Sequence, residues 1–180
     1  MVDEEDVIDA TRITIRRTTD GDVRQLPAVE RSAARSFATI PELSWIVDDD
    51  VLDEARPHRF AAAGWSWVAD RAGAPVGFIC AELVEGEVHV WELAVGEPYQ
   101  QQGIGSQLMA RIEAQARDAG ACALTLTTFS DVPWNGPFYA SLGYEVIDPE
   151  ACSARLRRIL ELEVQSGQPA GRRCAMRLRL

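Results

Sequence analysis

Seven short stretches of the chain have the patterns of β-strands: apolar and polar residues alternate at 12–17, 65–70 and 173–180, and residues 122–129 are rich in β-branched side chains. These predicted strands cover residues 12–17, 65–70, 76–84, 87–95, 122–129, 144–147 and 173–180. Apolar residues three and four positions apart predict helices between them. The predicted helices cover residues 20–37, capped by Asp20 or Asp22, residues 51–63, capped by Asp50, and residues 103–119, 133–142 and 149–165. Residues 41–50 read as a loop.

Short turns predict how the strands connect. Ala72-Gly73 and Glu85-Gly86 are two-residue hairpin turns, so the strands at 65–70, 76–84 and 87–95 form an antiparallel meander. The helix at 103–119 separates the strands at 87–95 and 122–129 and makes that pair parallel. No repeat or linker divides the chain. We therefore expect an acidic tail at residues 1–10 and a single mixed α/β domain at residues 11–180.

The stretch between the strand at 87–95 and the next helix carries the strongest chemical signal. Gln100, Gly103 and Gly105 stand at Q-x-x-G-x-G spacing just before the apolar helix pattern begins. Glycines let successive backbone N–H groups approach a ligand, and the start of a helix adds free N–H groups and a positive dipole end. Together these features predict a pyrophosphate site. A dinucleotide-binding G-x-G-x-x-G and a P-loop Gly-Lys-Ser/Thr are both missing here.

A second motif begins 27 residues after Gly105, in VPWNGPFYASLGYEVI at residues 132–147. The order of strand, Q-x-x-G-x-G, helix, strand and Asn-x-x-x-Tyr resembles the GNAT superfamily of N-acetyltransferases over residues 67–147. The resemblance implies the GNAT fold, a mixed central sheet of about seven strands with helices on both faces and a splayed parallel strand pair. It also implies acetyl-CoA as the co-substrate.

The resemblance further implies roles for individual residues. Acetyl-CoA would bind to backbone and side chains along the strand end, the glycine turn and the second motif: Leu93, Ala94, Val95, Gln100, Gln101, Gln102, Gly103, Ile104, Gly105, Ser106, Asn135 and Phe138. Tyr139 would lie near the sulfur and donate a proton to the leaving thiolate. The acceptor amine would attack directly in a ternary complex. The first two helices would line the acceptor side, where Glu30 and Phe37 are either substrate contacts or a surface charge and a core aromatic.

Acetyl transfer needs a base, because an amine with a pKa of about 10 is mostly protonated at neutral pH. Glu92 is the first candidate, since it is a carboxylate within a strand that should be buried, and burial raises a carboxyl pKa. The alternative is an acid that pairs with an arginine or attracts the substrate. His89 on the same strand is the rival base. Trp91, Phe129 and Trp134 form either an aromatic wall for an amine or part of the core.

The amino-acid composition limits the classes of partner and ligand that the protein is expected to bind. The formal net charge of −10 disfavours nucleic acid and favours a cationic substrate, although it also serves solubility alone. Four widely spaced cysteines and two histidines make a metal site improbable and indicate reduced thiols. No apolar run reaches membrane-helix length and the N-terminus lacks signal-peptide features, so the expected location is the cytoplasm, without a membrane partner.

These observations predict an acetyl-CoA-dependent N-acetyltransferase acting on a primary amine of a small cationic molecule. One alternative is a non-catalytic acyl-CoA-binding or sensing module. Another is a protein acetyltransferase acting on N-termini or lysines, because fold alone does not fix the acceptor. A homodimer formed through an exposed final strand is compatible with each of them.

Overall fold

The computed structural model describes residues 12–48 and 55–180. The predicted tail at 1–10 and the cap Asp50 lie outside the described residues. In chain order the elements are β1 (Ile13–Arg17), α1 (Asp20–Val23), α2 (Leu26–Ala34), η1 (Arg35–Thr39), η2 (Pro41–Asp48), α3 (Ala55–Ala62), β2 (Ser66–Arg71), β3 (Ala74–Val84), β4 (Glu87–Val95), η3 (Glu97–Tyr99), α4 (Ile104–Asp118), β5 (Ala123–Phe129), α5 (Gly136–Ser141), β6 (Glu145–Val146), η4 (Pro149–Ala151), α6 (Ala154–Gln165), η5 (Ala170–Arg172) and β7 (Arg173–Arg179). Those labelled η are 3₁₀ helices.

The strands form a seven-stranded mixed sheet in the order β1-β2-β3-β4-β5-β7-β6, which confirms the predicted fold class. The parallel pair joins Glu87–Val90 of β4 to Ala123–Leu126 of β5. β7 pairs antiparallel with β5 along its whole length, and its Met176 and Arg177 pair with β6 on the other side. The expected exposed final strand is therefore wrong, because β6 and not β7 ends the sheet. The homodimer itself stays a prediction.

Both predicted hairpin turns are present. Ala72 and Gly73 have φ of 52° and 85°, and Glu85 and Gly86 have φ of 54° and 78°. Two successive residues with positive φ are the mark of the tight turn whose twist matches that of the strands it joins. These turns confirm the meander of β2, β3 and β4.

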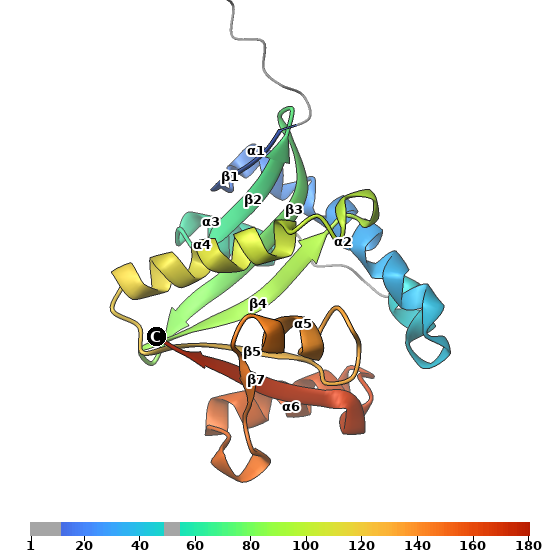
Figure 1. Ribbon diagram of the computed structural model, residues 1–180, viewed down its shortest axis with the longest axis vertical. Helices are drawn as coiled ribbons and strands as arrows, with labels where there is room; N and C mark the ends of the chain where they lie inside the picture. The colour runs from blue at the N-terminus through green and yellow to red at the C-terminus, as the bar shows by residue number, and fades with distance from the viewer. Residues whose placement is uncertain (1–11, 49–54) are drawn as a thin grey trace, which may run out of the picture. The chain divides into compact units, whose positions relative to one another are not determined.

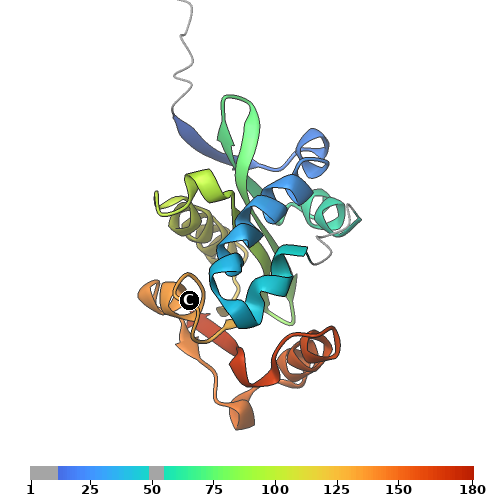
Figure 2. The ribbon, with the colours of Figure 1, turned by 90° about the vertical axis from the view of Figure 1, so that its right-hand side faces the viewer.

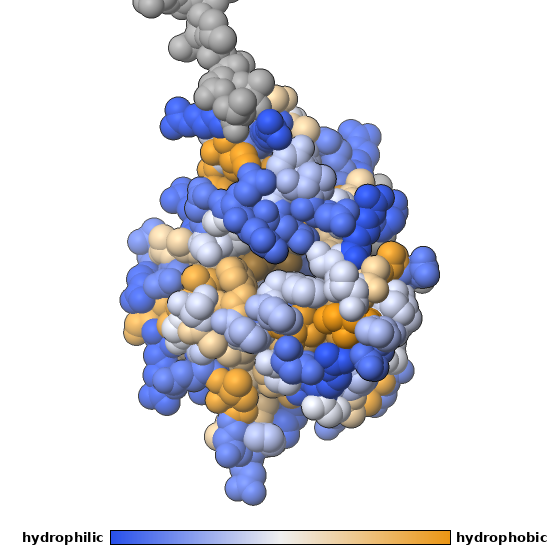
Figure 3. Space-filling model, turned by 45° about the vertical axis from the view of Figure 1, so that its right-hand side comes forward, coloured by the Kyte–Doolittle hydropathy of each residue, from blue (hydrophilic) through white to orange (hydrophobic). Residues whose placement is uncertain are grey.

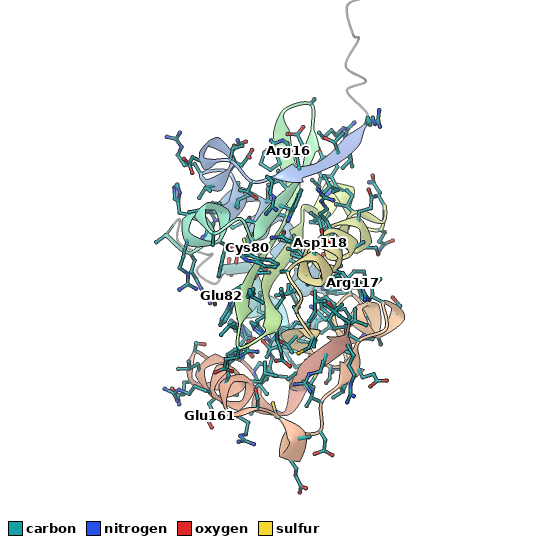
Figure 4. The ribbon with its side chains drawn as sticks, turned by 90° about the vertical axis from the view of Figure 1, so that its left-hand side faces the viewer. Arg16, Cys80, Glu82, Arg117, Asp118 and Glu161 are labelled. Atoms are coloured by element: carbon teal, nitrogen blue, oxygen red, sulfur yellow. The ribbon has the colours of Figure 1, made fainter. Side chains whose placement is uncertain are left out.

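The described chain divides into two compact units, one of residues 1–80 with 92–111 and the other of residues 81–91 with 112–180. In the first unit β1, β2 and β3 lie side by side (Figure 1). Arg111 of α4 packs over the Trp67 ring at 4.1 Å, so α4 covers that face of the sheet. Arg16, which is labelled on β1 in Figure 4, forms ion pairs with Asp22 and Asp70. Its guanidinium lowers the pKa of Asp22 to about 2.

In the second unit β5 and β7 lie side by side, and α6 packs against them (Figure 1). A small apolar core made by Cys152, Leu156, Ile159 and Ala175 holds the helix to the sheet. Glu163 of α6 adds polar contacts, because it accepts hydrogen bonds from Thr127 Oγ1 and from Arg173 at 2.8 Å. The second unit thus fixes the position of α6 through one apolar and one charged contact.

The helix predicted at 20–37 is instead three short helices, α1, α2 and η1. Pro27 lacks a backbone N–H and therefore suits the first turn of a new helix, not the interior of a continuous one. Neither Asp20 nor Asp22 is the N-cap of α1; Thr19 is, and its backbone N–H and hydroxyl both donate to the Asp22 carboxylate. After η1 the chain turns back, so that η2 lies beside it where a loop was expected (Figure 2).

Two helices in the second unit are also shorter than predicted. The segment expected as one helix at 149–165 is η4 followed by α6, because Ser153 adopts an extended conformation and accepts a hydrogen bond from the Leu156 N–H as N-cap. The helix expected at 133–142 is the six-residue α5, which begins only after Asn135. In both cases the helix begins directly after its N-cap residue. The apolar periodicity of the sequence alone does not identify that residue.

Hydrophilic residues cover much of the face drawn in Figure 3, with hydrophobic residues between them in small groups. Across residues 12–48 and 55–180, no helix is both long enough and apolar enough to cross a membrane. In the same described ranges, no group of three or more His, Cys, Asp or Glu side chains could hold a metal ion. The four cysteines are free thiols.

Candidate active site

The predicted phosphate turn lies between η3 and α4 and has the backbone that the glycine pattern suggested. Gln101 and Gly103 have φ of 59° and 77°, and α4 begins at Ile104. The first of the helical hydrogen bonds runs from Gln107 N–H to the Gly103 carbonyl, so the preceding N–H groups of the first turn have no partner within the helix. A Cβ at Gly103 would meet nothing within 4 Å. The turn therefore offers accessible N–H donors and a positive helix end to an anion.

Gln100 has a structural role that the motif did not predict. Its side-chain Nε2 donates to the Val95 carbonyl at 2.9 Å, and its Oε1 accepts from the Ser36 hydroxyl at 2.8 Å. This side chain ties the end of β4 to η1 and is engaged by protein atoms on both ends. Gln102 likewise donates to the Pro98 carbonyl at 3.1 Å. Gln101 is exposed, and its side chain makes no such tie to the described residues.

Close packing under the turn depends on Gly77 of β3. A Cβ at this position would lie 3.1 Å from the Ala94 carbonyl oxygen and 3.4 Å from the Ile104 side chain. A Cβ here would therefore crowd the end of β4 by a few tenths of an ångström, while its contact with α4 would be an ordinary one. Ala94 is buried, while Leu93 and Val95 are half-buried.

Glu92 is half-buried on β4, not fully buried as the strand pattern predicted. It lies near the buried thiol of Cys80, whose pKa burial raises to about 12, with the charges of Glu92 and Glu30 adding to the shift. Arg56 of α3 acts on the same thiol in the opposite sense. The first unit thus brings Glu92 of β4 and Glu30 of α2, which are 62 residues apart in the sequence, near Cys80.

In the second unit the Asn-x-x-x-Tyr motif forms the start of α5. Asn135 is the N-cap residue, and its carbonyl accepts the Tyr139 N–H at 3.0 Å. A Cβ at Gly136 would lie 2.5 Å from the Ser130 carbonyl oxygen, so only glycine allows α5 to start this close to the end of β5. Asn135 Oδ1 is buried and has no hydrogen-bond partner in the described part of the chain. A buried acceptor of this kind calls for a donor.

Tyr139 is 8% exposed and stands between two other aromatic rings. Phe138 contacts it edge-to-face with 5.1 Å between ring centroids, and Tyr144 does so at 5.9 Å. Burial raises the pKa of the Tyr144 phenol above its usual value, and the Tyr144 hydroxyl has no hydrogen-bond partner among the described residues. The ring contacts hold Tyr139 in one orientation, which a proton donor requires.

His89, the rival base, is 1% exposed. A hydrogen bond of 3.0 Å joins its Nδ1 to Thr125 Oγ1, and its ring packs edge-on against Trp91. Of the three aromatic residues proposed as a wall, Phe129 is buried under Arg173, Trp134 is exposed and Trp91 is half-buried. Phe129 is thus a core residue, and only Trp91 and Trp134 retain exposed surface.

Each unit therefore contributes one set of the predicted site residues. The first unit brings together the glycine turn, the end of β4 and Glu92, and the second brings together Asn135, Phe138 and Tyr139. Taken separately, the turn of the first unit offers N–H donors to an anion, and Asn135 Oδ1 of the second unit offers a buried acceptor to an N–H group. Sequence reasoning missed the close approaches at Gly77 and Gly136 and the tie made by Gln100, since none of them leaves a periodic signal.

Comparison with known proteins identifies the family. The model of the acetyltransferase (GNAT) family matches residues 28–144. Among solved structures, a PaiA N-acetyltransferase of Thermoplasma acidophilum in complex with coenzyme A matches with a TM-score of 0.71 and 16% identity, over 94% of this chain and 99% of that one. A ribosomal-protein-alanine N-acetyltransferase of Brucella melitensis matches with a TM-score of 0.65 and 21% identity, over 93% and 99%.

The N-acetylglutamate synthase of Neisseria gonorrhoeae, complexed with coenzyme A and N-acetyl-glutamate, matches with a TM-score of 0.69 and 16% identity, over 94% of this chain and 35% of that one. The TM-scores show that these proteins share the fold of this chain, and the low sequence identities limit the conclusion to the fold. The family match covers the Q-x-x-G-x-G turn and the Asn-x-x-x-Tyr part of the second motif, and it confirms the resemblance seen in them. The chain therefore belongs to the GNAT acetyltransferase family, whose members are N-acetyltransferases that use acetyl-CoA as the acetyl donor.

Proposed function

We propose that this protein transfers the acetyl group of acetyl-CoA to a primary amine of a small cationic molecule, by direct attack of the amine. The observation that carries the proposal is the turn at residues 100–106, where positive φ at Gln101 and Gly103 leads into the free N-terminus of α4. The segment at residues 96–106, GEPYQQQGIGS, contains no Lys or Arg, so these backbone donors would bind most of the pyrophosphate.

The cofactor would be held by backbone and by few side chains. The N–H groups of residues 103–106 would bind the pyrophosphate, and the backbone of Leu93, Ala94 and Val95 would pair with the pantetheine arm. Asn135 Oδ1 would accept an amide N–H from the same arm, which would satisfy an otherwise unpartnered buried oxygen. Phe138 would pack against the cofactor. Acetyl-CoA supplies the activated acetyl group.

Two side chains would move protons. Glu92 would act as a carboxylate and take a proton from the acceptor ammonium, since it is a half-buried acid on β4, two residues before Ala94. Tyr139 would give its phenolic proton to the departing thiolate, and the two neighbouring rings hold it in place for that step. In this mechanism Glu92 accepts one proton and Tyr139 donates one. No covalent bond forms between the acetyl group and the protein.

The acceptor is the less constrained part of the proposal. A small cation is favoured by the acidity of the chain. A protein amine is the second candidate, and the likeness to a ribosomal-protein acetyltransferase does not favour it, because identity of 21% supports the fold and not the acceptor. A binding module without turnover is the third candidate, which the family match disfavours.

A thiol-release screen tests the proposal. The protein is incubated with acetyl-CoA and, separately, with diamines, amino acids, aminoglycosides and peptides that present a free N-terminus or lysine. We expect amine-dependent release of free thiol with small cationic amines. Release only with peptides would transfer the proposal to a protein acceptor. Stabilisation by acetyl-CoA without release from any amine would contradict catalysis and leave a binding module.

A further inference from the structure

Gln100, the first residue of the glycine motif, uses its side chain on the protein itself. Its Nε2 group donates to the Val95 carbonyl at 2.9 Å and makes a longer contact of 3.5 Å with the Ala33 carbonyl. Its Oε1 accepts the Ser36 hydroxyl at 2.8 Å. A glutamine amide has two N–H donors and one carbonyl, so all three groups are engaged. The side chain therefore joins the end of β4 to both α2 and η1.

A second tie lies three residues earlier, in η3. The Glu97 backbone N–H donates to Ser32 Oγ of α2 at 3.0 Å, and the Glu97 carboxylate lies 3.6 Å from the Arg35 guanidinium. The ion pair is exposed and contributes little, whereas the hydrogen bond to Ser32 fixes the backbone of η3. Both ties join the segment that leads into the phosphate turn to residues 32–36, and all of these residues belong to the first unit.

The tied helix also lies beside the proposed base. Glu30 of α2 and Glu92 of β4 both act on the Cys80 thiol, whose pKa their charges help to raise. The acceptor amine must reach Glu92 to lose its proton, so α2 borders the place where the amine would bind. Glu30 precedes Ser32 by two residues and Ser36 by six, so a movement at either tie would reach it through a single turn or two of the chain.

Acetyl-CoA would restrict the motion of the turn, because its pyrophosphate would accept hydrogen bonds from backbone N–H groups at the start of α4. A segment tied to the turn then loses motion as well, and a second ligand that needs this segment ordered binds more tightly. We propose that Gln100 is a positioning residue, which passes the ordering of the turn through Ser36 to α2 and η1, so that bound acetyl-CoA tightens the binding of the amine. This inference rests on the proposed function and deepens it by naming how the donor site regulates the acceptor site.

Hydrogen exchange followed by mass spectrometry tests this coupling with acetyl-CoA alone, before any amine is known. In the wild-type protein, saturating acetyl-CoA should slow amide exchange in residues 100–106 and also, by about fivefold or more, in residues 26–39. Ser36→Ala removes one partner of Gln100 from outside the turn. It should keep the protection of residues 100–106 and lose that of residues 26–39. Gln100→Ala should act in the same way, and the double variant should lose no more, since the two side chains share one hydrogen bond.

Two further variants separate the tie from a general loss of stability. Ser36→Thr keeps the hydroxyl and should restore the protection of residues 26–39. Ser44→Ala removes a hydroxyl of the adjacent η2, which donates to the Pro41 carbonyl at 3.0 Å within the same helix. This matched control should behave as the wild-type protein does.

Steady-state kinetics with a small amine that the thiol-release screen identifies give a second readout. In the wild-type protein the KM of the amine should fall about fivefold or more as acetyl-CoA is raised from far below to far above its Kd. In Ser36→Ala this dependence should disappear, while kcat at saturation with both substrates stays near the wild-type value. A purely structural tie would instead lower the stability and leave the dependence in place.

The outcomes separate this inference from the proposed function. Protection of residues 100–106 without protection of residues 26–39 in the wild-type protein would overturn the coupling, and so would equal protection of residues 26–39 in the wild type and in Ser36→Ala. Loss of acetyl-CoA binding in Ser36→Ala would reduce the tie to a brace of the turn and would also overturn it. Absence of protection at residues 100–106 in the wild type, or of thiol release with every amine, would refute the proposed function instead.

Discussion

Two turns from strand to helix carry the predicted site, and each depends on a glycine for a different physical reason. In the first unit, Gly103 has φ of 77° before α4, and a Cβ there would meet nothing within 4 Å. In the second unit, Gly136 begins α5 without a positive φ, but a Cβ would lie 2.5 Å from the Ser130 carbonyl oxygen. Gly103 is needed for its conformation and Gly136 for space.

This difference predicts which property, ligand binding or stability, each turn loses when its glycine is substituted. A side chain at Gly103 would strain one residue and fill the space that a phosphate needs, while the surrounding protein stays in place. A side chain at Gly136 would collide with backbone, which cannot rotate away as a flexible side chain can. The first turn should thus lose binding more than stability, and the second should lose stability together with the positions of Asn135 and Tyr139.

The largest effect should come from Gly136→Ala. Relieving a contact of 2.5 Å to a carbonyl oxygen requires α5 to move away from β5, so we expect a loss of about 3 kcal/mol or more in the free energy of unfolding. Chemical denaturation measures it. Gly171→Ala is the matched control, because a Cβ there meets nothing within 4 Å and φ is not positive. Equal stability of the two variants would refute the steric role of Gly136.

The next effect concerns ligand binding at Gly103→Val. Saturation with acetyl-CoA at a hundred times its Kd should stabilise the wild-type protein by about 2.7 kcal/mol. The variant should lose that stabilisation, while its unliganded stability falls by only about 1 to 3 kcal/mol from backbone strain. Gly73→Val carries the same type of strain, with φ of 85° in the hairpin between β2 and β3, and should still respond to acetyl-CoA. A full acetyl-CoA response in Gly103→Val would remove the turn from the site.

Within α5, Tyr139→Phe tests chemistry without changing the backbone. The ring and its contacts with Phe138 and Tyr144 remain, and only the proton donor is lost. We expect kcat to fall about 10²-fold, the usual scale for loss of a general acid, with acetyl-CoA affinity nearly unchanged. Wild-type turnover in steady-state assays would exclude Tyr139 as the acid.

The smallest effect, of opposite sign, should come from Tyr144→Phe. This substitution removes a buried hydroxyl with no partner in the described residues, so the free energy of unfolding should rise by about 1 kcal/mol. Thermal or chemical denaturation detects it, and kcat should stay at the wild-type value, in contrast to Tyr139→Phe. A fall in stability would show that the hydroxyl is hydrogen-bonded in solution.

The conformation required at Gly103 can be expected from nearby residues, whereas the lack of space at Gly136 depends on distant ones. This difference explains which features could be predicted from the sequence. The strands, both hairpins, the parallel pair and the start of α4 follow from alternation, turn residues and glycine spacing, which are local signals. The breaks at Pro27 and Ser153 depend on a proline fitting a first turn and on one side-chain cap, and these compete with a continuing apolar period. Local patterns thus predict which helices and strands form more accurately than they predict the residues at which those elements begin and end.

Contacts between distant residues had no sequence signal. Gln100 looked like part of a phosphate motif, yet its side chain ties β4 to η1 through Val95 and Ser36. The approach of Gly136 to Ser130 and the bond from Trp91 to Glu82 likewise depend on which segments the fold brings together. The sequence was enough to predict which residues form the candidate site. The structural roles of several of them, such as Gln100, could be seen only in the structure.

A single-turnover experiment tests the central claim, direct acetyl transfer from acetyl-CoA to an amine. Excess protein is mixed with acetyl-CoA, first alone and then with a small amine that the screen identifies, and both the intact protein and the products are analysed by mass spectrometry. The account predicts no acetylated protein and no thiol release without the amine. With it, free thiol and acetylated amine should appear in equal amounts at the same rate. An acetylated protein whose acetyl group then passes to the amine would contradict direct attack.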